Sequence, residues 1–187
     1  MDFLNKYSHP KNKRFGSFKK ALETAESRNL KIIVETGTSR GKKKFLFFSK
    51  YNWKDGMSTL IFCDYAKHIN GRLFSCDINS QNIKFAKRFT KKFINYVDFI
   101  ESDSILFLKN FKHKIDFLYL DSLDGHKPAN ASIHQLNEIK SAIDKLHKNS
   151  LILLDDKNLK TTQSLEFLLS KKFKIINETN EQILLGC

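Results

Sequence analysis

Five short apolar runs along the chain each end in an acidic residue. They lie within residues 31–37, 72–77, 97–103, 116–121 and 151–156. Stretches in which apolar residues recur with helical spacing lie between most of them. The chain thus alternates between strands and helices, and polar residues follow each strand. This pattern predicts an open parallel α/β sheet. Such a sheet binds its ligand beyond the carboxyl ends of the strands, so the acids favour a binding or catalytic role.

The same periodicity predicts the individual elements. Strands are expected over residues 31–35, 72–76, 97–100, 115–120 and 151–154. Helices are expected over 58–68, from a cap at Ser80 onward, over 104–109, and from Thr161 or Thr162 onward. Another helix should bury Ile133, Leu136, Ile139, Ile143 and Leu146 on one face. Ser17 is a candidate cap for a first short helix. Residues 36–56 are expected to be irregular. The pattern of the last fifteen residues predicts two strands around a turn.

The composition is that of a packed globule. The chain has 187 residues, 41% of them hydrophobic, which is enough for one domain with a sizeable core. No apolar run approaches the roughly 20 residues needed to cross a bilayer, and the N-terminus has no apolar signal core. The three cysteines are expected to be free thiols in a reducing compartment. We therefore expect a cytoplasmic protein without a membrane partner.

The net charge of +13 is unevenly distributed. Residues 1–100 hold 21 Lys and Arg against 8 Asp and Glu, whereas residues 101–187 hold 12 against 12. A one-sided basic surface would attract nucleic acid, a phosphorylated metabolite or an acidic glycan. A general richness in Lys, Ile, Asn and Phe is an alternative explanation that implies no partner.

The loop after the first strand reads ETGTSRG, residues 35–41. Gly37 permits a positive φ and close backbone approach, and Thr38 adds a hydroxyl donor. Neither the dinucleotide fingerprint nor a Walker loop is present, so a pyrophosphate cradle is not indicated. Glu35 at the strand end suits a cationic group of a ligand.

Two further acids follow the next strands. Asp77 closes the second strand, where open α/β folds hold ribose hydroxyls with a carboxylate. Asp103, beside Ser104, is placed to accept a hydrogen bond from an adenine amino group. Helix capping is the alternative role for each acid, and it is a strong alternative for Asp103, because a helix is predicted to begin at Ser104.

Together the ETGTSRG loop, Asp77, Asp103, Asp121 and the closing strand pair resemble a class I S-adenosylmethionine-dependent methyltransferase over about residues 31–187. The resemblance implies an α/β Rossmann-like three-layer sandwich. Its seven-stranded sheet would be mostly parallel with an antiparallel last strand, and residues 1–30 would be an N-terminal leader and helix.

The resemblance also implies roles for single residues. Gly37 and Thr38 would lie under the amino-acid part of the cofactor, Asp77 would hold its ribose, and Asp103 would face its adenine. Residues 42–57 lengthen the first loop relative to the family. Ser58 and Thr59, at the start of the following helix, could then meet the cofactor carboxylate.

A metal site is a separate expectation. Asp121 follows the fourth strand and Asp155 and Asp156 follow the fifth, so the three carboxylates should meet. Without a basic partner they would repel one another, and Mg²⁺ would relieve the repulsion. The set resembles that of metal-dependent small-molecule and sugar O-methyltransferases, in which the ion lowers the pKa of the acceptor hydroxyl. Asp121 would then be catalytic and His126 is a candidate base, whereas helix capping is the alternative for Asp155 and Asp156.

These residues lead to one main hypothesis, an S-adenosylmethionine-dependent O-methyltransferase that acts on a hydroxyl of a small molecule or glycan, with Mg²⁺ as a candidate cofactor. The loop DSLD after the fourth strand lacks the NPPY-type sequence of amine methylation and a Pro-Cys pair, which favours an oxygen acceptor. An RNA methyltransferase that uses the basic first half and a non-catalytic Rossmann-like binding module are the alternatives. The short chain also suggests an open site, a homodimer that completes it, or a large acceptor.

Overall fold

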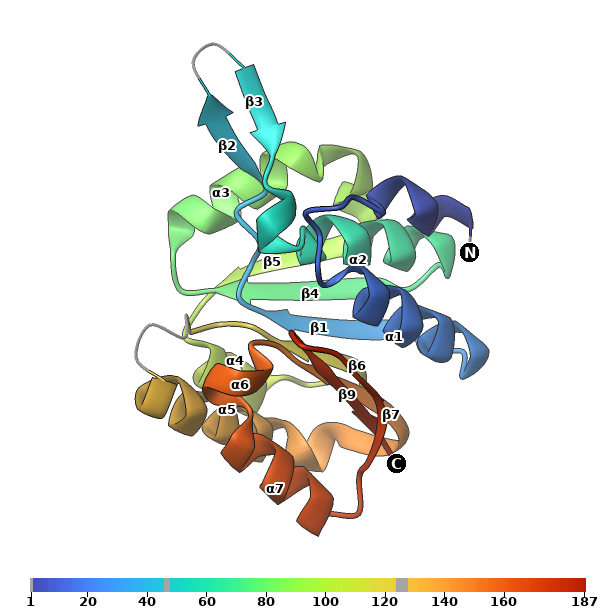
Figure 1. Ribbon diagram of the computed structural model, residues 1–187, viewed down its shortest axis with the longest axis vertical. Coiled ribbons are helices and arrows are strands. Elements are labelled where there is room, and N and C mark those ends of the chain that lie inside the picture. The colour runs from blue at the N-terminus through green and yellow to red at the C-terminus, as the bar shows by residue number, and fades with distance from the viewer. Residues whose placement is uncertain (1, 46–47, 124–127) are drawn as a thin grey trace.

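The computed structural model describes residues 2–45, 48–123 and 128–187, and for residues 42–45 and 48–50 it describes the backbone alone. Its centre is a seven-stranded sheet in the order β5-β4-β1-β6-β7-β9-β8 (Figure 1). The strands are β1 (Ile32–Thr36), β4 (Arg72–Asp77), β5 (Val97–Glu101), β6 (Ile115–Leu120), β7 (Leu146–Leu154), β8 (Lys174–Glu178) and β9 (Ile183–Gly186). Strand β9 pairs antiparallel with both β7 and β8, and the other pairs are parallel. The predicted fold class is confirmed.

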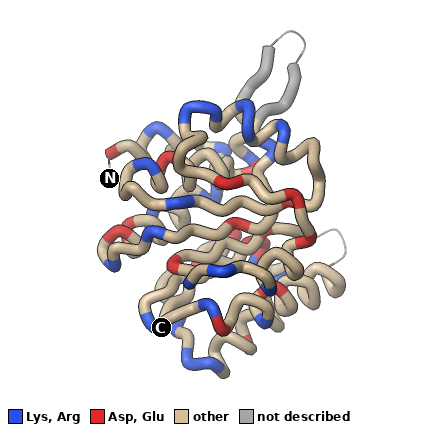
Figure 2. The backbone as a smooth tube through the Cα atoms, turned by 180° about the vertical axis from the view of Figure 1, so that it is seen from behind, with Lys and Arg blue, Asp and Glu red and all other residues tan. Residues whose placement is uncertain are grey.

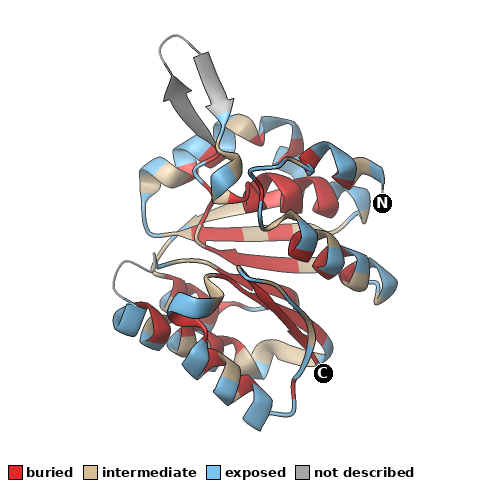
Figure 3. Ribbon diagram, viewed as in Figure 1, coloured by how far each residue is buried: buried red, intermediate tan, exposed pale blue. Residues whose placement is uncertain are grey.

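Helices cover both faces of this sheet and make three layers (Figures 1 and 3). One face carries α1 (Phe15–Ser27), α2 (Ser58–His68) and α3 (Ser80–Phe89), and the other carries α4 (Ser104–Asn110), α5 (Pro128–Ala142), the short α6 (Lys157–Lys160) and α7 (Thr162–Ser170). Neighbouring strand residues alternate between the layers, so Ile33 belongs to the first core cluster and Val34 to the second. Short 3₁₀ turns lie at Asp2–Tyr7, Trp53–Asp55, Lys91–Tyr96 and Ile143–Lys145.

The N-terminal residues share the first of these cores. Leu4 and Tyr7 are buried together with Phe18 and Leu22 of α1 and with the facing side chains of the sheet. The Tyr7 hydroxyl donates to Asp64 Oδ2 at 2.7 Å, and Asn12 Nδ2 donates to the carbonyl of Gly56 at 3.2 Å. The leader is therefore docked against α2 and the loop that precedes it.

Three predictions of local structure are wrong. Residues 36–56 are not wholly irregular, because β2 (Lys42–Phe45) and β3 (Phe48–Tyr51) form a separate antiparallel hairpin. Ser17 lies inside α1, where its hydroxyl donates to the carbonyl of Arg14 instead of capping the helix. Asn79, not Ser80, caps α3, since its Oδ1 accepts from the Gln81 amide at 2.9 Å.

The buried face of α5 also differs from the prediction. The helix ends at Ala142, Leu146 already belongs to β7, and Ile133 is 50% exposed. Ile139 is buried as predicted, but the other buried side chains are small or polar, namely Ala131, Ser132, Gln135, Glu138 and Ala142. The apolar periodicity was misleading because this helix packs part of its inner face against the polar edge of the sheet. No helix in the described ranges combines the length and apolarity that crossing a membrane requires.

Candidate functional site

A cavity of about 440 Å³ lies at the carboxyl ends of the central strands. Its walls include the loop after β1, Asp77 after β4, Asp121 after β6 and Asp156 after β7. A smaller cavity of about 130 Å³ adjoins it and is lined by Asp103, Ser104 and His134. The two share Gly37, Asp77, Ile78 and Ser122, so they form two compartments of one site.

Gly37 sets the shape of the loop after β1. Its φ is +84°, and a Cβ atom built on it would lie 1.9 Å from the backbone oxygen of Asp121. Its amide donates to the carbonyl of Cys76 at 2.9 Å. Only glycine allows the loops after β1 and β6 to approach this closely, which leaves room in the cavity beside them.

Asp77 is held in place by donors from its own neighbourhood. Its Oδ2 accepts from the amide of Thr38 and from Asn82 Nδ2, each at 3.0 Å, and its Oδ1 accepts from the amide of Asn79 at 2.7 Å. These bonds join the loops after β1 and β4 and fix the carboxylate at the cavity wall. Gly37, Thr38 and Asp77 are thus brought together at one wall of the larger cavity.

Asp103 caps a helix and also lies at a cavity wall. Its Oδ1 accepts from the amide of Leu106 at 2.9 Å and so caps α4. The same residue lines the smaller cavity beside Ser104. The Ser104 hydroxyl lies 3.0 Å from His134 Nε2, and this nitrogen is 3.7 Å from Glu138 Oε1. Burial raises the pKa of Glu138, and His134 opposes that shift.

Glu35 lies beneath the larger cavity and lines neither compartment. It is fully buried and accepts hydrogen bonds from the hydroxyls of Ser58 at 2.5 Å, Thr59 at 2.8 Å and Ser75 at 2.5 Å. Burial raises the pKa of Glu35 to about 7, although the three hydroxyls lower it. The three hydroxyls surround the Glu35 carboxylate, and its expected direct contact with a ligand cation stays a prediction.

Ser58 and Thr59 share this inward arrangement. Both are buried and neither lines a cavity. Thr59 Oγ1 accepts from the amide of Ser39 at 2.8 Å, so the two hydroxyls connect Glu35 to the loop that does form the cavity wall. Their side chains support that loop, and their expected contact with the cofactor carboxylate stays a prediction.

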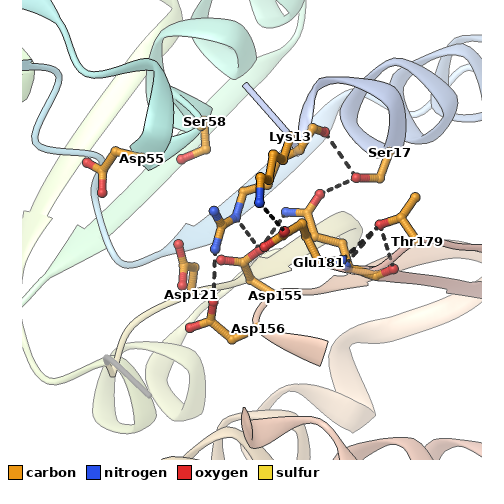
Figure 4. A network of polar contacts seen from close by, with 12 residues as sticks. Lys13, Ser17, Asp55, Ser58, Asp121, Asp155, Asp156, Thr179 and Glu181 are labelled. Carbon is orange, nitrogen blue, oxygen red and sulfur yellow. Dashed lines mark hydrogen bonds and ion pairs between the residues drawn. The ribbon is translucent and has the colours of Figure 1, made fainter. Parts of the chain in front are cut away.

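Asp121, Asp155 and Asp156 come together as expected, with one carboxylate oxygen of each within 4.8 Å of the others (Figure 4). The assumption that they have no basic partner is wrong. Arg14 Nε donates to Asp155 Oδ1 at 2.7 Å, and its NH2 group donates to Asp156 Oδ1 at 2.8 Å. Lys160 Nζ lies 2.9 Å from Asp121 Oδ1 and 3.3 Å from Asp156 Oδ2.

These ion pairs determine the protonation of the cluster. Burial would raise the pKa of Asp121, but Lys160 and Arg14 hold it below its ordinary value. Burial and the charge of Asp121 raise the pKa of Asp155 well above its ordinary value. Lys160 is 2% exposed, and its neighbouring carboxylates raise its pKa against the effect of burial. Asp121 is consequently an ionised carboxylate at neutral pH.

Further polar side chains hold Asp155 in place through a chain of hydrogen bonds. Gln182 Nε2 donates to Asp155 Oδ1 at 2.8 Å and to the Tyr119 hydroxyl at 3.3 Å, and Ser17 donates to Gln182. The Tyr119 hydroxyl in turn donates to Asp121 Oδ2 at 3.2 Å. Residues from α1, β6 and the turn before β9 thus hold the cluster in one arrangement.

Sequence reasoning missed Arg14, Lys160 and Glu138. Lys160 follows Asp156 by four positions, and that spacing on a helix was a usable signal. Arg14 gave no local signal, because it is 141 positions from Asp155 along the chain. His126, the candidate base, lies outside the described residues.

A three-layer sandwich with an antiparallel β9 and a polar ligand cavity at the carboxyl ends of its strands defines the class: it is the fold of class I S-adenosylmethionine-dependent methyltransferases. A family model described as a methyltransferase domain matches residues 53–157, which is more than half of the chain, and the chain belongs to that family. No curated protein matches the chain by sequence.

Solved structures agree with this assignment at the level of the fold. A Podospora anserina methyltransferase bound to S-adenosylhomocysteine is 16% identical, with a TM-score of 0.60 over 89% of this chain and 76% of that one. An rRNA methylase from Streptococcus thermophilus is 13% identical, with a TM-score of 0.59 over 89% and 93%. The N-methyltransferase NodS from Bradyrhizobium japonicum is 11% identical, with a TM-score of 0.59 over 89% and 90%. The protein is an S-adenosylmethionine-dependent methyltransferase.

Proposed function

We propose that this methyltransferase acts on a hydroxyl oxygen and that it does so without a bound divalent ion. The observation that carries the proposal is the position of Asp121, an ionised carboxylate in the wall of the larger cavity, paired with Lys160 and adjoining the walls that carry Gly37 and Asp77. A carboxylate at this place accepts a hydrogen bond from an acceptor hydroxyl and orients its oxygen.

The residues of the two compartments fit the cofactor. We assign the ribose to Asp77, the adenine to the compartment of Asp103 and Ser104, and the amino-acid part to the loop of Gly37 and Thr38. In the described structure the buried hydroxyl of Ser39, a residue of the cavity wall, has no hydrogen-bond partner, which supports a polar ligand beside it. When bound, the cofactor supplies a methyl group on a sulfonium, and this chain's part is to position the acceptor, which lowers a barrier by about 7–11 kcal/mol in favourable cases.

The ion pairs argue against a metal requirement. A divalent ion at Asp121, Asp155 and Asp156 would have to displace the Arg14 guanidinium and the Lys160 ammonium, which already occupy oxygens of all three carboxylates. Oxygen ligands suit Mg²⁺ in kind. The charge repulsion that would make Mg²⁺ necessary is nevertheless relieved by the two basic side chains.

A chelator tests this part of the proposal. We expect EDTA to leave the melting temperature and the binding of S-adenosylmethionine unchanged, and added Mg²⁺ to have no effect, because Arg14 and Lys160 balance the cluster. Differential scanning fluorimetry and isothermal titration measure both quantities. A rise in melting temperature with Mg²⁺ that EDTA reverses would restore the metal as a cofactor.

Cofactor binding is tested at Asp77. In the wild type, S-adenosylmethionine and S-adenosylhomocysteine should each raise the melting temperature, because a ligand that binds only the folded state stabilises it. Asp77→Asn should weaken binding at least about tenfold, since a hydrogen bond to a charged group contributes about 1.5–3 kcal/mol. Asp144→Asn, the same change at an exposed acid outside both cavities, is the matched control. Equal binding by both variants would remove Asp77 from the cofactor site.

The walls of the larger cavity also bear on the acceptor. Among the described residues that line it, Ile78 is the one with a large apolar side chain. Aromatic and other apolar acceptors would find little surface to pack against. A glycan or another polyhydroxyl molecule fits the polar walls, and so does a ribose of RNA. RNA is the second candidate because of the basic residues beside the cavity.

A further inference from the structure

Two stretches of the chain carry many basic residues and no acid. Residues 40–54 contain six Lys and Arg, and residues 78–97 contain five, with no Asp or Glu in either stretch. A biased composition alone would scatter acids among them, as it does in residues 101–187, where basic and acidic residues are equal in number. The position of the two stretches in the fold therefore matters.

The fold brings the two stretches together. Gly41, at the base of the β2–β3 hairpin, lies so close to Phe89 at the end of α3 that a Cβ atom would be 1.9 Å from the Phe89 ring. The hairpin projects from the body of the molecule on the same side as α3 (Figure 1). From behind, Lys and Arg are seen near the base of this projection (Figure 2).

The side chains of α3 and the turn after it face solvent. Lys84, Lys87 and Arg88 are exposed on the outer side of α3, and Lys91 and Lys92 are exposed in the following 3₁₀ turn. Phe85 is 44% exposed among them, with the Arg88 guanidinium 5.8 Å from the centre of its ring. Basic side chains interleaved with an exposed aromatic ring are typical of surfaces that hold phosphates and stack bases. We call Arg40, Lys54, Lys84, Lys87, Arg88, Lys91 and Lys92 the basic face.

The basic face is continuous with the cavity. Arg40 and Lys54, from the two ends of the hairpin stretch, line the larger cavity. Asn79 and Asn82, at the start of α3, line it as well. A polyanion that lies along α3 and the base of the hairpin would therefore reach the cavity mouth from two sides.

We propose that the acceptor is RNA, whose phosphates bind the basic face while a ribose hydroxyl enters the larger cavity. This inference rests on the proposed transfer to a hydroxyl and deepens it. In the transfer an O–C bond forms as an S–C bond breaks, the electron pair of that bond stays on sulfur, and the hydroxyl proton passes to water. The 2′-hydroxyl distinguishes RNA from DNA, and the polar cavity favours a ribose over the apolar groups of a lipid.

The test compares two charge-matched triple variants of the full chain. Lys84→Gln, Lys87→Gln and Arg88→Gln remove three charges from the basic face. Lys148→Gln, Lys171→Gln and Lys174→Gln remove three exposed charges from the opposite half of the chain. Fluorescence anisotropy measures binding of a labelled stem-loop RNA, of the DNA of the same sequence, and of phosphatidylserine vesicles, each over a series of salt concentrations.

We expect the basic-face variant to bind the RNA at least about tenfold more weakly than the wild type, and the control variant to bind it as the wild type does. The slope of log K against log salt should fall in magnitude by about 2 in the basic-face variant, because each lost phosphate contact removes about 0.7–0.9. Equal losses in both variants would overturn the proposal, as would equal binding of RNA and DNA or tighter binding of the vesicles.

The thermal shift with S-adenosylmethionine separates this inference from the proposed function. The basic-face residues on α3 do not line either cavity, so the shift should persist in that variant. If the basic-face variant keeps the melting-temperature shift and binds RNA as tightly as the wild type does, the RNA inference alone is overturned. Loss of the shift in the wild type would instead overturn cofactor binding, whatever the RNA result.

Discussion

At the scale of single residues, the acids of this chain have different roles because their surroundings differ. Asp77 receives its hydrogen bonds partly from backbone amides and remains at the cavity wall. Glu35, on the neighbouring strand, is fully buried and accepts hydrogen bonds from three buried hydroxyl groups. Both follow apolar strand residues in the sequence, so the sequence could locate them at the same edge but could not distinguish a ligand-facing acid from a supporting one.

The raised pKa of Glu35 makes the stability of the protein depend on pH. Its pKa of about 7 lies above the ordinary 4.5, so the folded state holds this proton more tightly than the unfolded state. The contribution to stability is fully present below pH 4.5 and is lost as the pH rises through 7. The free energy of unfolding should fall by about 3 kcal/mol over this window from Glu35 alone.

Glu35→Gln should remove that part of the pH dependence. Urea denaturation between pH 5 and 8 should therefore give a smaller fall in stability for this variant than for the wild type. Glu23→Gln, an exposed acid of α1, is the control and should keep the wild-type profile. The same slope in Glu35→Gln and wild type would show that Glu35 is ionised in the folded state throughout the range.

At the scale of elements, the loops after the strands decide the geometry of the site. The loop after β1 comes very close to the loop after β6 at Gly37, and Asp77 ties the loop after β4 to the loop after β1. The sequence predicted a tight turn at Gly37 from its place after a strand. It could not predict the hairpin β2–β3, because the stretch KKKFLFFSKY contains no Gly, Pro, Asn or Asp that would mark a turn between two strands.

Gly37→Ala should test the contact between these loops. The new methyl group would meet backbone atoms of Asp121, which cannot move as a side chain could, at a φ of +84° that disfavours L residues. We expect a loss of about 2 kcal/mol or more in unfolding free energy, with weaker binding of S-adenosylmethionine.

Gly16→Ala is the control for this substitution. Gly16 lies in the first turn of α1 with open space around it, so alanine should be neutral or stabilising by up to about 1 kcal/mol. Urea denaturation and isothermal titration measure both variants. If Gly37→Ala is as stable as the wild type, the backbone oxygen of Asp121 must lie farther from a Cβ atom at position 37 than the 1.9 Å in this structure.

At the scale of the whole molecule, the N-terminal residues belong to the same folded body as the sheet. Leu4 and Tyr7 are buried against α2, and Arg14 reaches the acids that follow β7. This docking places a basic side chain in the cavity wall from a segment whose sequence is polar and unpatterned. The domain boundary at residue 30 that the sequence suggested remains a prediction.

Leu4→Ala measures how firmly the leader is docked. Leu4 is fully buried, so its truncation should lower the free energy of unfolding by about 2–4 kcal/mol. Asn5→Ala, the exposed neighbour in the same 3₁₀ turn, should change it by less than about 0.5 kcal/mol. Urea denaturation of both variants provides the comparison, and equal stabilities would indicate a leader that is loose in solution.

The sequence by itself determined the succession of the main-sheet strands and most helices along the chain, the closing strand pair and the edge at which Asp77, Asp103 and Asp121 gather. These features follow from periodicity and from single residues next to apolar runs, and both are local. The tertiary structure alone decided that Arg14 pairs with Asp155, that Glu35 faces inward, and that the two basic stretches meet beside the cavity. Such contacts join residues far apart in the chain, so they exist only once the layers have packed together.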